Sequence, residues 1–222
     1  MNHKTCQAPG CSRACESRFG KFCPAHASRH RRHGHPEQQG VTKAMLKPYF
    51  KAVRRIRARN KKLDWSAVDA RWDAVVETAK GIIADIKAGK AYHLGTRQAA
   101  ASILTIAENV EVKDIIDHVI AVYLMQAFEP TFFRDDHAFN AQLVRILRKT
   151  TPANALFWTT EAGMEKRAYQ ELTPSARKIL ATWITTSLGP VGVHLVKLEE
   201  VRIDNGATAK AAFHDTLSQL RV

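Results

Sequence analysis

Residues 6–26 read CQAPGCSRACESRFGKFCPAH, and this stretch decides how the N-terminal end of the chain folds. Residues 1–35 hold too few apolar side chains for a core, so such a segment needs a metal ion to fold. Cys6 and Cys11 form a C-x4-C pair, and Cys23 and His26 form a C-x2-H pair eleven residues later. Two close pairs separated by a short loop are typical of a tetrahedral structural zinc site. We therefore predict a zinc-binding knuckle over residues 1–35, with these four side chains holding a structural Zn²⁺.

Cys15 leaves the ligand set open. All four cysteines lie between positions 6 and 23, and no secretory signal is visible, so metal binding is favoured over disulfides. Cys15 could replace Cys6 by pairing with Cys11 as C-x3-C, or it could be a spare thiol. The alternative to a metal site is four free cysteines in a disordered basic tail.

The run Cys6–Arg13, followed by Phe19–His26, resembles a short zinc knuckle of bacteriophage and mobile-element proteins. In that pattern a C-x4-C pair is followed by a Gly-aromatic or Gly-Leu step and a C-x2-H pair, often with Arg residues after it. The pattern is frequently attached to HNH-type endonucleases and other DNA-binding proteins. The resemblance implies zinc at the four ligands named above. It covers only the N-terminal segment and implies nothing firm about the helical remainder.

The net charge of +13 is concentrated at the N-terminal end of the chain. Residues 1–62 contain 16 Lys and Arg but only two acidic residues, whereas residues 63–222 contain 18 basic and 19 acidic residues. A basic end on a neutral body is typical of an arm that binds a polyanion. Nucleic acid is the common partner, and an anionic membrane surface or an acidic protein is the alternative.

The basic side chains of this arm form two groups. The first follows the knuckle directly, and the second lies on a predicted helix over residues 45–62, whose apolar stripe would dock on the body. Arg and Lys at this density neutralise phosphates and give salt-sensitive affinity. The alternatives are a solvated basic helix face and a flexible tail over residues 29–33. We predict phosphate contacts from Arg29, Arg31, Arg32, Arg54, Arg55, Arg57, Arg59, Lys61 and Lys62.

The rest of the chain predicts a mostly α fold. Residues 36–44 indicate a linker, and residues 45–222 a helical domain. Helices are expected from Ser66 to Gly89 and over about 96–109, 112–128, 135–149 and 173–189. Two more are expected over about 191–203 and 207–220, with a short strand over 191–196 as an alternative to the first. No other strand pattern stands out, and no apolar stretch of about 18 uncharged residues suggests a membrane span.

Two groups of side chains invite an enzymatic interpretation, and we favour a structural role for both. His93, Asn109 and His118 occur in the order of an HNH nuclease, but they fall on predicted helices or helix edges rather than on a ββα element. Asp135, Asp136 and His137 lie where a helix N-cap and an acidic first turn are expected.

The sequence therefore predicts a non-enzymatic nucleic-acid-binding protein of phage or mobile-element origin, with DNA favoured over RNA as the partner. Zinc would be structural, and the neutral helical body would bind a protein partner or self-associate. The alternatives are a protein-interaction factor that docks on a nucleic-acid-processing machine, and an HNH-like nuclease. The expected location is the cytoplasm of a bacterial host cell.

Overall fold

The computed structural model describes residues 4–61, 64–161 and 163–219. These residues form seven α-helices and one two-stranded hairpin, which confirms the prediction of a mostly α fold. The elements are α1 (Pro24–His33), α2 (Lys43–Arg59), α3 (Ser66–Lys87), α4 (Leu94–Asn109), α5 (Val112–Phe128), α6 (Asp136–Arg148), a 3-10 turn (Pro152–Asn154), β1 (Ala155–Thr159), β2 (Glu165–Tyr169) and α7 (Pro174–Gln219).

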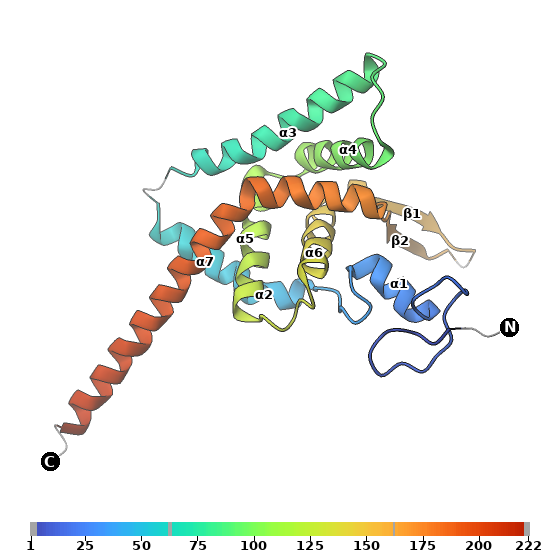
Figure 1. Ribbon diagram of the computed structural model, residues 1–222. Coiled ribbons are helices and arrows are strands. Elements are labelled where there is room, and N and C mark those ends of the chain that lie inside the picture. The colour runs from blue at the N-terminus through green and yellow to red at the C-terminus, as the bar shows by residue number, and fades with distance from the viewer. Residues whose placement is uncertain (1–3, 62–63, 162, 220–222) are drawn as a thin grey trace.

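Helix α7 is the central helix of the fold. It runs across the other helices, with α3 and α4 on one side and α5, α6 and α2 on the other (Figure 1). Helix α5 is apolar around most of its circumference, and a helix of that kind is stable only when it is surrounded by other elements. The core therefore lies between α5 and the first half of α7, and its fully buried members include Ile115, Ile120, Leu124, Leu180 and Ile184.

The predicted helix end at residue 189 and the predicted break between residues 203 and 207 are wrong, since α7 is continuous from Pro174 to Gln219. The alternative strand over residues 191–196 is wrong for the same reason. A Cβ atom at Gly189 would lie 2.7 Å from the hydroxyl oxygen of Tyr123, and a Cβ atom at Gly192 would lie 2.7 Å from its ring. These glycines therefore let α5 approach α7 closely rather than ending the helix. Pro190 between them lies inside α7, on an exposed position.

The hairpin of β1 and β2 was also not predicted from the sequence. The two strands pair antiparallel, from Ala155 opposite Tyr169 to Thr159 opposite Glu165. Five residues per strand give too little alternation to stand out from the loop around them. The hairpin lies beside the start of α7, close to α1 (Figure 1).

Residues 36–44, which were expected to link two parts, are packed against the body. Gln38 is buried, and its side-chain oxygen accepts a hydrogen bond from the backbone N–H of Arg134. The backbone N–H of Val41 donates to the side-chain oxygen of Gln142 at 3.0 Å. Helix α2 then begins at Lys43 and ends at Arg59, and Lys62 lies outside the described residues.

Helix α7 also corrects the expectation that no segment is long and apolar enough to cross a membrane. Within the described part of the chain one helical stretch, Pro174–Thr208, meets that criterion by length and composition alone, and its most apolar 18-residue window has a mean hydropathy of 1.4. In its most apolar window 44% of the residues are buried inside the protein. Leu180, Ile184 and Leu188 from this stretch belong to the core, and a core helix passes the same test.

Candidate metal centre

Cys6, Cys11, Cys23 and His26 form one cluster whose four candidate ligand atoms all lie within 4.8 Å of one another. The Nδ1 atom of His26 is 3.4 Å from the sulfur of Cys6 and 3.4 Å from the sulfur of Cys23. The sulfur atoms of Cys11 and Cys23 are 3.9 Å apart. The four side chains lie close enough to hold a metal ion, and they are the four that the sequence predicted.

Local backbone structure brings the two pairs together. Pro9 and Gly10 make a turn in which the N–H of Cys11 donates to the carbonyl of Ala8, and Gly10 has a positive φ of 68° that favours glycine. In the second pair, Cys23 caps α1 and Pro24 occupies its first turn. His26 follows Cys23 by three residues, so the helix start turns both side chains to the same side.

The pKa of the Cys11 thiol is lowered to about 6, so this sulfur is available as a thiolate at neutral pH. The backbone N–H of Arg13 and then its side chain are the main causes, because both stabilise the negative charge. The pKa of Cys6 is raised instead, mainly by burial. A cluster with one ready thiolate and one protonated thiol would release protons when it binds a cation.

Cys15 lies outside the cluster. It is buried, and its backbone N–H donates to the carbonyl of Lys4, beside an isolated bridge between Thr5 and Ala14. The structure therefore answers the question that spacing left open, since Cys6 and not Cys15 shares the cluster with Cys11.

Helix α1 packs the cluster onto the helical body. Gly34 ends α1 with a φ of 87°, and a Cβ atom there would lie 2.7 Å from the carbonyl oxygen of His137 in α6. Arg177 in α7 donates a hydrogen bond of 2.6 Å to the carbonyl of Arg31. The N-terminal segment with this cluster is thus held against α6 and α7 rather than joined to them by a free linker.

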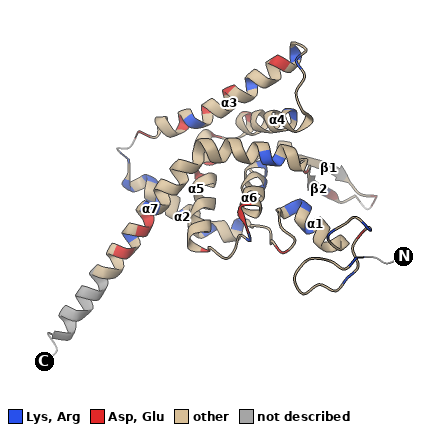
Figure 2. Cartoon of the chain, in the orientation of Figure 1, with Lys and Arg blue, Asp and Glu red and all other residues tan. Residues whose placement is uncertain are grey.

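The predicted phosphate-contacting residues fall into two separate places. Arg29, Arg31 and Arg32 are on α1. Arg54, Arg55 and Arg59 are exposed in the second half of α2, and Lys61 is exposed just after its end. Arg55 also pairs with the buried Glu199 of α7 at 3.4 Å. Figure 2 shows the basic residues of α1 near the start of α7 and those of α2 near its middle. The opposite face of α2 is apolar and buried, as the predicted stripe requires, and its buried residues are Leu46, Tyr49, Ala52, Val53 and Ile56.

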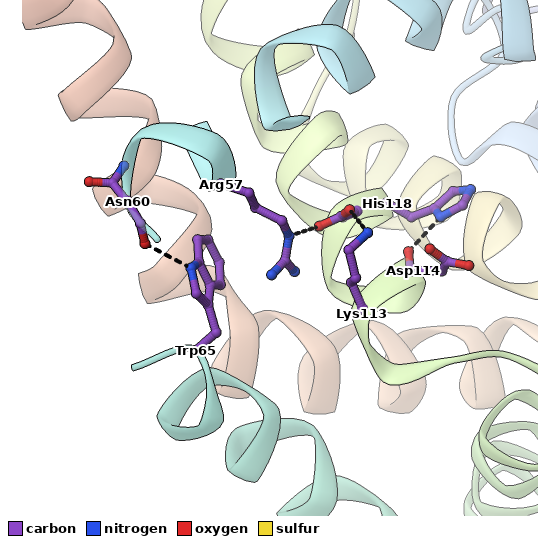
Figure 3. A network of polar contacts seen from close by, with 7 residues as sticks. Arg57, Asn60, Trp65, Lys113, Asp114 and His118 are labelled. Atoms are coloured by element: carbon purple, nitrogen blue, oxygen red, sulfur yellow. Dashed lines mark hydrogen bonds and ion pairs between the residues drawn. The ribbon is translucent and has the colours of Figure 1, made fainter. Parts of the chain in front are cut away.

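Arg57 is engaged within the protein. Its Nε atom lies 2.5 Å from a carboxylate oxygen of Asp117, and the side chains are 16% and 10% exposed. The guanidinium carbon stacks 4.0 Å from the ring centroid of Trp65, whose indole N–H donates to the carbonyl of Asn60. Lys113 approaches the second oxygen of Asp117 at 3.2 Å. Figure 3 shows Arg57 directed at α5 within this network, where it ties α2 to the core.

The enzymatic alternatives have other roles in the structure. His93 caps α4 and Asn109 ends it, which separates them by about 24 Å along a 16-residue helix. The His118 ring packs edge-on against Phe50, with 4.7 Å between ring centroids. Asp135 accepts a hydrogen bond from the backbone N–H of Ala138, which confirms it as the N-cap of α6.

Sequence reasoning missed a third group of basic side chains. Arg145, Arg148, Lys149 and Arg177 lie with Arg32 around a hollow between α1, α6, the hairpin and α7. The only sequence signal was the short run Arg145-Ile-Leu-Arg-Lys149, which the neutral total charge of residues 63–222 conceals.

Comparison of the chain with protein-family models, with curated proteins and with solved structures finds no match to any of them. The function is therefore argued from the geometry and charge of these sites.

Proposed function

We propose that the protein is a non-enzymatic nucleic-acid-binding protein with one structural zinc ion. The observation that carries this proposal is the placement of the excess positive charge. The exposed cationic side chains of α1 and α2 face outward from helices whose other contacts fix them to the body. Ordered cations of this kind bind a phosphate backbone with affinity that depends on salt and little on sequence.

Zinc is the proposed ion because three cysteines and one histidine are a ligand set that it prefers, and three of the distances in the cluster fit its bond lengths. Bonds of about 2.3 Å to sulfur and about 2.0 Å to nitrogen in a tetrahedron place two sulfur ligands about 3.8 Å apart and a sulfur and a nitrogen about 3.5 Å apart. The cluster has 3.9 Å between two sulfur atoms and 3.4 Å between sulfur and nitrogen. Four protein ligands fill the tetrahedron and leave no open position for a substrate, so the role of zinc is to hold the fold.

We propose DNA rather than RNA as the partner, and the cytoplasm of a bacterial cell as the location. We also propose that the protein is encoded by a phage or a mobile element. The support on these points is the resemblance of the Cys and His pattern to the phage knuckle, together with thiol ligands that persist in a reducing compartment. Arg57 takes no part, because its guanidinium group already pairs with Asp117.

The test is fluorescence anisotropy of labelled duplex and single-stranded DNA over a range of salt concentrations. We expect affinity to fall steeply with salt, and Arg54→Gln, Arg59→Gln and Lys61→Gln together to reduce the slope on duplex DNA by about 0.9 for each phosphate that these side chains no longer neutralise. The matched control is Lys80→Gln, Lys87→Gln and Arg97→Gln, which removes the same charge from exposed positions on α3 and α4. No salt-sensitive binding, or an equal effect of the two triple variants, would refute the proposal.

A further inference from the structure

A hollow that is partly open to solvent lies where α1, α6, the end of β2 and the start of α7 meet. Five of its eleven lining residues are cationic, and Glu171 is the single acidic one. Three of these cations lie within residues 145–149, and the fold brings Arg32 and Arg177 to them from distant positions in the sequence.

Two of the arginines are almost wholly buried. Arg148 is 9% exposed and Arg177 is 7% exposed, and burial lowers the pKa of both guanidinium groups. Burial and the charge of Arg145 also lower the pKa of Lys149. An arginine stays charged in a protein, so desolvated cations that surround one space are unfavourable unless an anion offsets them.

The arginines are fixed in place and still have donors to spare. Arg148 donates to the carbonyl of Gln170, and Arg177 donates to the carbonyl of Arg31. Within the described residues, six buried side-chain nitrogen or oxygen atoms lack a hydrogen-bond partner, and three of them are the Nε atoms of Arg145, Arg148 and Arg177. Half of these unsatisfied atoms thus belong to residues that line one hollow, which is unusual because buried polar groups are normally paired.

We propose that Arg32, Arg145, Arg148, Lys149 and Arg177 form a binding site for a phosphate group. A terminal phosphate, joined to its carrier by one ester bond, fits better than an internal phosphodiester. It carries a charge of about −1.5 to −2 at pH 7 and three acceptor oxygens, which suit a cluster of five cationic side chains.

This site goes beyond the proposed function, because it does not require nucleic-acid binding. The phosphate could belong to a small phosphorylated compound or to the end of a nucleic-acid strand. Inorganic phosphate tests the site alone, and an oligonucleotide tests the source of the phosphate.

The experiment measures binding of inorganic phosphate to the full chain by isothermal titration calorimetry at moderate salt, about 0.1 M, where remote charges are screened. Arg145→Gln with Lys149→Gln should weaken phosphate binding at least about tenfold, which corresponds to removing one charge-assisted hydrogen bond. These two residues are chosen because Arg148 and Arg177 also hold the hairpin and α1. The control, Arg54→Gln with Arg59→Gln, removes equal charge from α2 and should change the affinity by less than about twofold at moderate salt.

Glu171→Gln is the complementary variant. Glu171 pairs with Arg145 at 3.4 Å at the rim, and its side chain is 47% exposed. Removing this competing anion should strengthen phosphate binding, whereas a variant that merely disturbs the fold would weaken it. Absence of phosphate binding, or an equal weakening by the pocket variants and the α2 variants, would overturn the proposal.

A short single-stranded oligonucleotide with and without a 5′-phosphate then assigns the source. Tighter binding of the phosphorylated strand, abolished in the Arg145 and Lys149 double variant, places a strand end in the site. Binding of inorganic phosphate without discrimination between the strands supports the site and assigns it to a small phosphorylated compound. Neither outcome depends on whether the cations of α2 bind DNA, so failure of the proposed function and failure of this site are distinguishable.

Discussion

His33 is a residue whose role changed between the sequence and the structure. In the sequence it belongs to a run of basic residues. In the structure its Nδ1 atom lies 2.9 Å from the side-chain nitrogen of Gln142, whose oxygen accepts from the backbone N–H of Val41. The amide nitrogen can only donate, so Nδ1 must accept, and the imidazole is neutral. His33 is therefore part of the contact between the N-terminal segment and α6.

This contact predicts a dependence of stability on pH. Burial, and then the charges of Arg145, Arg32, Lys149 and Arg29, lower the pKa of His33 to about 4 from an ordinary value of 6.5. Between these values the unfolded chain binds more protons than the folded one, so stability falls as the pH falls from about 6.5 to about 4. Below about pH 4, His33 is protonated in both the folded and the unfolded protein, so it lowers the stability no further.

The measurement is the melting temperature at pH 7 and pH 5. His33→Gln should show a smaller decrease on acidification than the unsubstituted protein, because its side chain does not titrate. His194→Gln, at an exposed position on α7, should show the same decrease as the unsubstituted protein. Equal decreases in all three proteins would contradict the assignment. Other titrating groups, including the thiols, are common to the compared proteins and cancel.

The four clustered ligands could be predicted from sequence, whereas the surroundings of the cations could not. Spacing within 21 residues is enough to predict that two close pairs of side chains come together, because local backbone geometry decides where such side chains point. Arg57 looked like its neighbours on α2 and proved to be paired with Asp117, 60 residues later. Such pairing depends on which helices pack together, and helical spacing shows only which residues share a face.

At the scale of elements, periodicity predicted the helices of the body because each has a buried stripe of apolar residues. It failed where Gly189 and Pro190 were interpreted as a helix end. Packing of α7 against α4 and α5 stabilises the helix on both sides of Pro190, and tertiary packing overrides the local propensity of glycine and proline. The sequence could not distinguish a glycine that ends a helix from one whose lack of a side chain leaves room for Tyr123.

Two glycine substitutions test this interpretation because they have opposite expected signs. Gly192→Ala in α7 places a Cβ atom 2.7 Å from two ring atoms of Tyr123, and should destabilise the protein by about 1–3 kcal/mol through overpacking. Gly81→Ala in α3 meets no atom within 4 Å, and should stabilise the protein by about 0.5–1 kcal/mol, since alanine favours a helix.

Urea denaturation gives both values from the shift in midpoint at constant slope. If Gly192→Ala were stabilising as well, close packing of α5 on α7 at this glycine would be refuted. Gly81→Ala is the control, because its expected gain shows that the assay can detect an increase in stability.

At the scale of the whole molecule, the excess positive charge forms two separate groups of side chains rather than one continuous arm. The cations of α1 lie beside the hollow at the start of α7, and those of α2 lie near its middle (Figure 2). The sequence places both within its first 62 residues, but α2 is 17 residues long and carries its last cations about 25 Å from its first turn. A ligand that reaches both groups must be extended, as a nucleic-acid strand is.

Metal removal tests how the N-terminal end and the body depend on each other. Cys23 and His26 of the cluster lie at the start of α1, whereas the core of the body lies in α2 to α7 and contains none of the cluster residues. We expect a chelator, or Cys11→Ser, to remove the metal and unfold α1, which is a loss of ten helical residues, while the body stays helical. Cys15→Ser should retain about one zinc per chain, because its sulfur is outside the cluster.

Metal content by mass spectrometry, with far-ultraviolet circular dichroism and amide hydrogen exchange, separates these outcomes. Exchange should rise in α1 and at Val41, whose N–H is held by Gln142, because Gln142 also contacts His33 at the end of α1. It should change little in α5, whose buried residues pack against α2 and α7 instead. A metal content well below one per chain in the unsubstituted protein would refute the metal centre. Collapse of the whole helical signal on chelation would show instead that the body cannot fold without it, and that the packing of α1 against α6 and α7 contributes more stability than two separate cores would suggest.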